Sequence, residues 1–352
     1  MVNYTFRASK RELSNWKNAY LSKDRKEKGE DILFQRIGLM DPSIGTSNMG
    51  DYIIQDAIKK NIRQIFPTSF VSTFPTQLSR KMDSVTLMQE QDIILIGGTN
   101  LLASNMDSRF QWKVTPRDTY FFPNKMVLFG TGWWQYQETP NNYTKNLFSG
   151  LLSKTFLHSV RDSYTKDKLK SIGIENVINT TCPTLWSIDE EACSAIPSKK
   201  ASNVITTLTF YNKDHNKDSA LIKLLQANYD LVYIWIQGFE DMGYLKEIAP
   251  DLERIITVNP DLHFYDEILA TNEDIEYVGT RLHAGIRAIQ HGKRSLIVAV
   301  DNRAFEISKD TNLNVIRREE LEKCNAFIHN EYRTNIKLPE ENITIWKNQF
   351  MK

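Results

Sequence analysis

The sequence has few cysteines, no long hydrophobic run and almost no net charge. Its three cysteines form no CxxC pair, and an odd, sparse set is typical of a reducing compartment. The 44 Lys and Arg residues balance 43 Asp and Glu residues, so no overall charge draws the protein to nucleic acid. The longest apolar runs, at 93–96 and 296–300, are far shorter than the roughly 20 residues of a membrane-spanning helix. Any anion that the protein binds must therefore be held by a local cluster of charges.

Several catalytic signatures are also absent. The sequence contains no GxGxxG, HExxH, GxSxG or Asp-x-Asp motif. These absences remove the usual support for nicotinamide chemistry, zinc hydrolysis, serine hydrolysis and metal-dependent transfer from a sugar nucleotide. We therefore predict neither a metal ion nor a cofactor.

The N-terminal 20 residues are polar and lack the apolar core of a signal peptide, which predicts a cytoplasmic protein. The basic stretch 23–28 leaves two interpretations open: a solvated helix face, or peripheral contact with the inner face of the membrane.

Short apolar segments alternate with helical patterns along the chain. Strands are expected at 92–98, 126–129, 158–160, 204–210, 231–236, 255–258, 275–279 and 296–300. Such alternation predicts right-handed βαβ units and parallel sheets. The stretch 190–202, with a proline and two lysines, divides the strands into two sets. We expect an α/β protein with a lead-in (1–30), two Rossmann-like domains facing a cleft (31–195 and 196–316), and a C-terminal helix and tail (317–352).

Ligands of open α/β sheets bind beyond the carboxyl ends of the strands, near helix N-termini. The strongest candidate there is Gly279-Thr280-Arg281-Leu282-His283-Ala284-Gly285, in which a strand passes directly into a helix. Arg281 and His283 would lie near the positive end of the helix dipole, which suits a small dianion. A histidine packed in the core is the alternative interpretation of His283.

Four other strand ends carry polar groups, and each has two interpretations. Asn48 and Asp51 either cap a helix or accept hydrogen bonds from sugar hydroxyls. Gly97 and Gly98 form either a tight turn or an anion-binding nest. Arg161 either clamps an anion or pairs with Asp162.

The fourth strand end is Asp301-Asn302-Arg303, where Asp301 either accepts a hydroxyl proton or caps a helix. Aromatic residues offer a sugar-stacking surface. These aromatic residues are Trp133, Trp134, Tyr136 and Trp235. Trp133 and Trp134 are the better candidates, whereas core packing is the more frequent role for Trp235.

Taken in order, these motifs resemble the polysaccharide pyruvyl transferase family. The matching segments cover about 45–305 and are Asn48-Met49-Gly50-Asp51, the run DIILIGG at 92–98, Val160-Arg161-Asp162, Thr280-Arg281-Leu282-His283-Ala284-Gly285 and the strand into Asp301. Two positions depart from the family pattern. Cys182-Pro183-Thr184 stands where many members have Asp-Pro and an aromatic residue, and Arg303 stands where many have lysine.

The resemblance implies transfer of a pyruvyl group from phosphoenolpyruvate, as a donor substrate, to sugar hydroxyls of a cell-surface polysaccharide or its lipid-linked precursor, forming a ketal. It also implies a GT-B-like fold, with the acceptor on the N-terminal domain and the donor on the C-terminal one. The expected catalytic residues are His283 as acid and Asp51 or Asp301 as base. The expected substrate-binding residues are Arg281, Arg161, Asn48, Gly50, Gly97, Gly98, Leu282 and Arg303. A GT-B-type glycosyltransferase that uses a nucleotide sugar is the alternative, and a non-catalytic carbohydrate-binding protein is a third.

Overall fold

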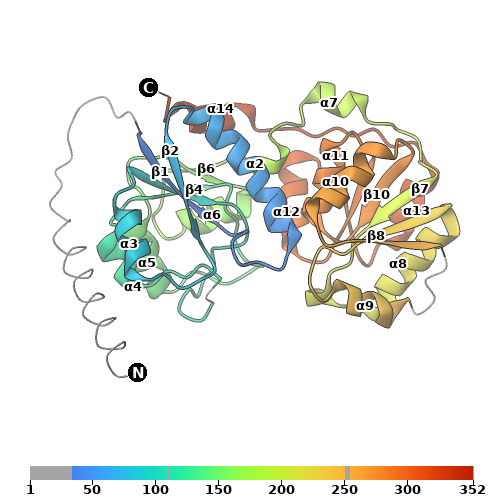
Figure 1. Cartoon of the computed structure of the whole chain (residues 1–352), viewed down its shortest axis with the longest axis horizontal. Helices are drawn as coiled ribbons and strands as arrows, with labels where there is room; N and C mark the ends of the chain where they lie inside the picture. The colour runs from blue at the N-terminus through green and yellow to red at the C-terminus, as the bar shows by residue number, and fades with distance from the viewer. Residues whose placement is uncertain (1–33, 110, 250–253, 352) are drawn as a thin grey trace, which may run out of the picture.

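Two parallel β-sheets, each with helices on both faces, form the two halves of the molecule (Figure 1). The computed structural model describes residues 34–109, 111–249 and 254–351. The expected lead-in at 1–30, with its basic stretch 23–28, lies outside the described residues. Among those that are described, no helix combines the length and the apolar character needed to cross a bilayer.

The N-terminal half is built on a four-stranded sheet of order β2-β1-β3-β4, and a two-stranded pair, β5-β6, continues it beside β4. Its strands are β1 (Arg36–Asp41), β2 (Phe70–Pro75), β3 (Ile93–Gly97), β4 (Met126–Phe129), β5 (His158–Val160) and β6 (Val177–Asn179). Its helices are α2 (Met49–Ile65), α3 (Met82–Gln89), α4 (Pro116–Phe121), α5 (Asn142–Leu151) and α6 (Ser163–Lys170).

The C-terminal half is built on a six-stranded sheet of order β12-β11-β10-β7-β8-β9, in which all pairs are parallel. Its strands are β7 (Asn203–Thr206), β8 (Leu231–Trp235), β9 (Ile255–Val258), β10 (Ile275–Gly279), β11 (Ser295–Ala299) and β12 (Val315–Arg317). Its helices are α8 (His215–Asn228), α9 (Asp241–Ile248), α10 (Leu262–Thr271), α11 (Leu282–Gln290), α12 (Asn302–Thr311) and α13 (Leu321–His329).

The segment between the halves contains a short 3-10 helix, η2 (Pro183–Leu185), and α7 (Glu190–Ala195). The stretch 317–352, expected as a C-terminal helix and tail, divides between the halves. Its first part completes β12 and forms α13 on the second sheet, whereas α14 (Glu340–Asn348) returns to the first. There the fully buried Trp346 packs on Phe129, with ring centroids 4.5 Å apart.

The α/β class with parallel sheets is confirmed. Continuous apolar strands such as β3 are buried on both faces, as expected when helices cover a parallel sheet from both sides. The expected strand 204–210 is shorter, because β7 ends at Thr206 and the chain turns into a 3-10 helix, η3 (Phe210–Asn212). The Thr209 hydroxyl then bonds the Thr280 hydroxyl at 2.8 Å, which ties the turn to the end of β10.

Candidate active site

The two halves meet where the carboxyl ends of their strands face one another. Asn48, the N-cap of α2, pairs with Gly238 beyond β8, and the Met49 N–H donates to the Gln237 carbonyl at 2.9 Å. A Cβ on Gly50 would lie 2.7 Å from Gln237 Nε2, so only glycine permits this approach without rearrangement. Asn48 and Gly50 therefore lie at a seam between the halves.

Five of the predicted residues, drawn from both halves, form a group that we call the central cluster: Asp51, Arg161, His283, Asp301 and Arg303. Arg303 lowers the pKa of Asp51, and Arg161, Arg303 and Asp301 act on the pKa of His283, so charges from both halves interact here. These residues follow strands or begin helices that are far apart in the sequence. The cluster exists only because the two sheets face each other.

Arg161 lies deep in the cluster, with 1% of its surface exposed. Its guanidinium donates to the Asn100 side chain, and its Nε lies 3.4 Å from the Asp162 carboxylate. Asp162 also caps α6 by accepting from the Thr165 N–H. A Cβ on Gly132 would lie 2.1 Å from Arg161 Nε, so this glycine makes room for the side chain. The expected pairing of Arg161 with Asp162 is therefore present, and it lies in the interior of the protein rather than on a rim.

His283 lies in the first turn of α11 and is 6% exposed. Its Nε2 lies 3.7 Å from the Sγ of Cys182, which in turn accepts a hydrogen bond from the Thr184 hydroxyl at 3.1 Å. Burial, followed by the positive charges of Arg161 and Arg303, lowers the pKa of His283 well below its usual range. The imidazole is therefore neutral at pH 7 when no anion is bound.

The pKa values of the two aspartates of the cluster shift in opposite directions. Burial raises the pKa of Asp51 from 3.8 to about 6, against the hydrogen bonds from Thr46 and Thr99. Burial also opposes ionisation of Asp301, but Arg303 outweighs it and lowers the pKa of that carboxyl. Asp301 caps α12 and binds the Arg303 guanidinium, whereas α2 is capped by Asn48 rather than by Asp51.

Arg281 is held beside the cluster by an ion pair that the sequence does not reveal. Its Nη2 donates to both carboxylate oxygens of Asp241, at 2.7 and 2.8 Å, and its Nε donates to the Leu208 carbonyl at 2.7 Å. The Arg281 guanidinium also lies over the Tyr211 ring, 5.0 Å from its centroid. The Nε and Nη2 groups of Arg281 therefore already donate hydrogen bonds within the protein, which leaves fewer donors for a dianion.

Three further predicted residues have packing partners. The Leu282 side chain lies in the hydrophobic core. Cβ atoms on Gly97 and Gly98 would lie 2.9 Å from Gln55 Nε2 and 2.3 Å from Ile54 Cγ2, so these glycines let α2 approach β3. The tight-turn interpretation of the pair accounts for both residues.

The prediction that Trp133 and Trp134 form a sugar-stacking face is wrong for Trp133. Trp133 is fully buried against Phe148, and the Trp134 ring is covered by Arg109, whose Cζ lies 3.5 Å from the centroid. Trp235 is buried and stacked on Tyr265, as expected for core packing.

Tyr211 is a residue of the site that the sequence pattern missed. It lies in η3, is 49% exposed, and accepts a hydrogen bond from Arg303 at its hydroxyl. The signal that would have found it is its position at the carboxyl end of β7, which the overlong expected strand concealed.

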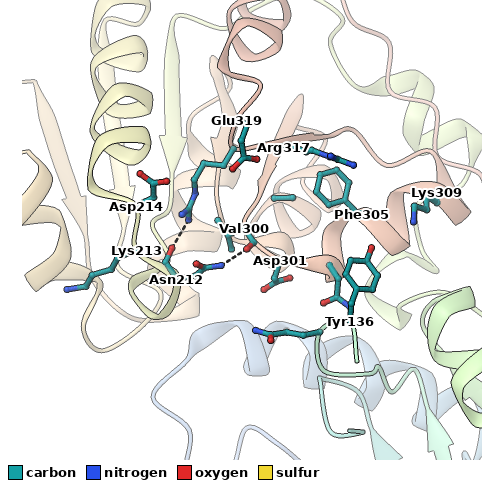
Figure 2. Close-up of a pocket in the computed structure, with 14 residues that line it drawn as sticks. Tyr136, Asn212, Lys213, Asp214, Val300, Asp301, Phe305, Lys309, Arg317 and Glu319 are labelled. Atoms are coloured by element: carbon teal, nitrogen blue, oxygen red, sulfur yellow. Dashed lines mark hydrogen bonds between the residues drawn. The ribbon is translucent and has the colours of Figure 1, made fainter. Parts of the chain in front are cut away.

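A pocket of about 690 Å³ opens beside the cluster, between η3 and the ends of β11 and β12 (Figure 2). Asp301 lines it, and Tyr136 reaches it from the N-terminal half. Within the described ranges, no three His, Cys, Asp or Glu side chains are placed to hold a metal ion.

The family model for polysaccharide pyruvyl transferase matches residues 48–302, which run from the N-cap of α2 to the start of α12. The chain belongs to the polysaccharide pyruvyl transferase family. The matched segment holds four of the five cluster residues, and membership in this family makes the protein a transferase.

No curated protein matches this pyruvyl transferase family member. Among solved structures, it is similar to the apo form of the lipopolysaccharide outer core galactosyltransferase WaaB, with 9% identity, a TM-score of 0.49, and coverage of 84% of this chain and 89% of that one. It is also similar to a UDP-GlcNAc 2-epimerase from Neisseria meningitidis bound to UDP-GlcNAc, with 12% identity, a TM-score of 0.37, and coverage of 84% and 94%.

Proposed function

We propose that the protein transfers the pyruvyl group of phosphoenolpyruvate to two hydroxyls of a sugar in a cell-surface polysaccharide or its lipid-linked precursor, forming a cyclic ketal. The observation that supports this most is the central cluster, where Arg161 and Arg303 lie together with a neutral His283. Phosphoenolpyruvate carries a carboxylate and a phosphate, and guanidinium groups bind both through charge-assisted hydrogen bonds.

The reaction needs one proton delivered and two removed. A proton added to the methylene carbon turns it into a methyl group and leaves the neighbouring carbon electrophilic. One sugar hydroxyl adds to that carbon and loses its proton. The bond to phosphate then breaks, phosphate leaves with the electron pair, and the second hydroxyl adds and loses its proton. One released proton replaces the one delivered, and the other goes to phosphate.

The directions of the pKa shifts indicate which residue of the cluster carries out each proton transfer. Asp51, with a pKa of about 6, is the carboxyl group whose proton is available near neutrality, so we assign it the delivery step. Asp301 is ionised and lines the pocket, so we assign it the hydroxyl proton. His283 then acts as a neutral hydrogen-bond partner of the bound anion, and acts as an acid only if that dianion raises its pKa again.

Thermal denaturation with added ligands tests this function, since a ligand that binds only the folded state raises the melting temperature. Phosphoenolpyruvate should stabilise the wild-type protein. The shift should be lost in His283→Ala and Arg303→Gln and kept in Arg63→Gln, a control at an exposed position in the last turn of α2. Phosphate release from phosphoenolpyruvate should likewise be lost in His283→Ala and Arg303→Gln and kept in Arg63→Gln.

Two other outcomes of the same experiment would reject the proposal. Stabilisation by UDP or GDP without stabilisation by phosphoenolpyruvate would indicate a glycosyltransferase that uses a nucleotide sugar. A protein that responds to neither ligand, and that tolerates loss of His283, would be a carbohydrate-binding protein without this chemistry.

A further inference from the structure

A second pocket, of about 560 Å³, lies in the N-terminal half between the loops that follow β3 and β4. Its volume falls within the range of about 300–1,000 Å³ that is typical of ligand pockets. The residues that line it are Asn105, Ser108, Arg109, Gln111, Trp134 and Gln137. Both loops leave the carboxyl ends of their strands, so this pocket lies at the same edge of the sheet as the central cluster.

The segment 134–137 separates this second pocket from the pocket of about 690 Å³ beside the central cluster. Trp134 and Gln137 line the second pocket, whereas Gln135 and Tyr136 line the first (Figure 2). Gln135 has a φ of 52°, in the left-handed region, so the chain turns sharply where it passes between the pockets. A ligand long enough to cross this segment would contact both pockets.

Arg109 is a cation of the second pocket without a carboxylate partner. No Asp or Glu in the described part of the chain forms an ion pair with it, and the carboxylate of the nearby Asp107 accepts a hydrogen bond from the Asn141 side chain instead, at 2.9 Å. The Arg109 Nη2 donates to Gln111 Oε1 at 2.8 Å, whereas its Nε and Nη1 donate to no other described residue. Burial lowers the pKa of Arg109 to about 10, so the guanidinium is still charged at pH 7. It therefore retains donors for a ligand.

The rest of the lining is aromatic or uncharged. The Arg109 guanidinium lies over the Trp134 ring, 3.5 Å from its centroid, so the two groups form one wall of the pocket. The amide groups of Asn105 and the NH₂ groups of Gln111 and Gln137 form no hydrogen bond with another described side chain or backbone group. Amides and hydroxyls match the donors and acceptors of sugar hydroxyls, and an aromatic ring packs on the C–H groups of a sugar ring. This lining therefore suits a neutral sugar better than a phosphate, for which a single cation is a sparse set of partners.

We infer that the second pocket binds another sugar of the acceptor, next in the chain to the sugar that receives the pyruvyl group. This sugar packs on Trp134, and its oxygens accept hydrogen bonds from Arg109 and the amide groups. The inference rests on the proposed function, since the first pocket, beside Asp301, then holds the reacting sugar. It adds that the enzyme recognises an oligosaccharide of at least two sugars rather than a monosaccharide.

Binding of neutral trisaccharides tests the inference without any turnover. We would titrate the wild-type protein with maltotriose, cellotriose, chitotriose and galactotriose, and with the matching monosaccharides, and follow binding by ligand-observed NMR. At least one trisaccharide should bind about tenfold or more tightly than its monosaccharide, as expected for one or two added hydrogen bonds to a charged group. Trp134→Leu and Arg109→Gln should each remove that advantage. Phe70→Leu and Arg63→Gln, which remove a ring and a guanidinium at exposed positions outside both pockets, should keep it.

Thermal denaturation without ligand shows whether each variant is folded, and Arg109→Gln decides the test if Trp134→Leu is not. No trisaccharide advantage anywhere in the panel, or an advantage that the folded variants retain, would overturn the inference. The melting shift of the wild-type protein with phosphoenolpyruvate is measured separately. That shift without a trisaccharide advantage would reject the second sugar site and keep the donor. A trisaccharide advantage that depends on Trp134 or Arg109, without that shift, would reject the donor and keep the sugar site.

Discussion

The Sγ of Cys182 lies 3.7 Å from the Nε2 of His283, although 101 residues separate them in the sequence. The thiol belongs to the segment between the halves and the imidazole to the second half, so the contact forms only when both are in place. Burial raises the pKa of Cys182 and lowers that of His283. The pair is therefore a neutral thiol beside a neutral imidazole, not a thiolate–imidazolium pair.

This protonation state predicts slow alkylation of Cys182. Thiolate is the reactive form, and each unit by which the pKa rises lowers its fraction about tenfold near neutral pH. At pH 7.5, iodoacetamide should label Cys182 at least about tenfold more slowly than free cysteine, as followed by peptide mass spectrometry. Protein unfolded in urea, where all three cysteines are accessible, is the control. Labelling of the folded protein as fast as free cysteine would show that the pair is ionised.

The raised pKa of Asp51 predicts that the contribution of this carboxyl group to stability falls as pH rises from about 4 to about 6. Between 3.8 and about 6, the folded protein keeps the Asp51 proton that the unfolded chain releases. Unfolding then releases a proton, so higher pH favours it, by about 3 kcal/mol across the window. Asp51→Asn removes this dependence, so the variant should gain stability relative to wild type between pH 4 and pH 7.

Urea denaturation at the two pH values measures this difference. Asp230→Asn, at an exposed position outside the cluster, should show no such trend. A constant difference between wild type and Asp51→Asn would mean that the carboxyl group titrates at its ordinary pKa.

The ion pair that holds Arg281 predicts a large cost for removing its partner. Asp241→Ala would leave a guanidinium that is 4% exposed without its carboxylate, and breaking a buried pair costs about 3–5 kcal/mol. Glu331→Ala provides the comparison, because Glu331 pairs with Lys199 at 3.9 Å with both side chains mostly exposed. That change should cost at most about 1 kcal/mol in the free energy of unfolding. Equal losses in urea denaturation would mean that Asp241 does not stabilise Arg281.

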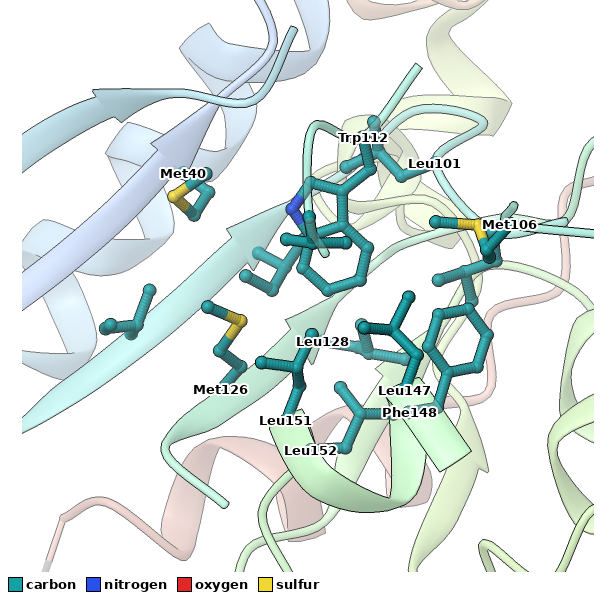
Figure 3. Close-up of a cluster of buried hydrophobic side chains, with 14 of the residues drawn as sticks. Met40, Leu101, Met106, Trp112, Met126, Leu128, Leu147, Phe148, Leu151 and Leu152 are labelled. Carbon is teal, nitrogen blue, oxygen red and sulfur yellow. The ribbon is translucent and has the colours of Figure 1, made fainter. Parts of the chain in front are cut away.

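The sequence predicts the central strands of both sheets but not all of their neighbours. β3 and β11 are continuous apolar runs because both faces are buried. β1 escapes this pattern, since it includes Gly38 and ends in a buried aspartate, although its Met40 packs in the core with Met126 and Leu128 (Figure 3). β2 is an edge strand with an exposed first half, so it lacks a buried run altogether.

The positions of residues at strand ends indicate where the site lies. The side chains that these residues contact do not follow from the sequence. The motif around Arg281 gives its place at the start of a helix, but Asp241 lies 40 residues earlier on another helix. Trp133 likewise packs against Phe148, which lies on a different element, α5. Such contacts are set by how helices pack on the sheet, which local spacing does not specify.

Since α14 returns to the first sheet, the second half is joined to the first by two segments of chain, one entering β7 and one leaving α13. The Arg287–Asp56 ion pair and the hydrogen bonds of Ser163 with Asp310 also cross between the halves. The two connections and these contacts together restrain how far one half can shift along the other.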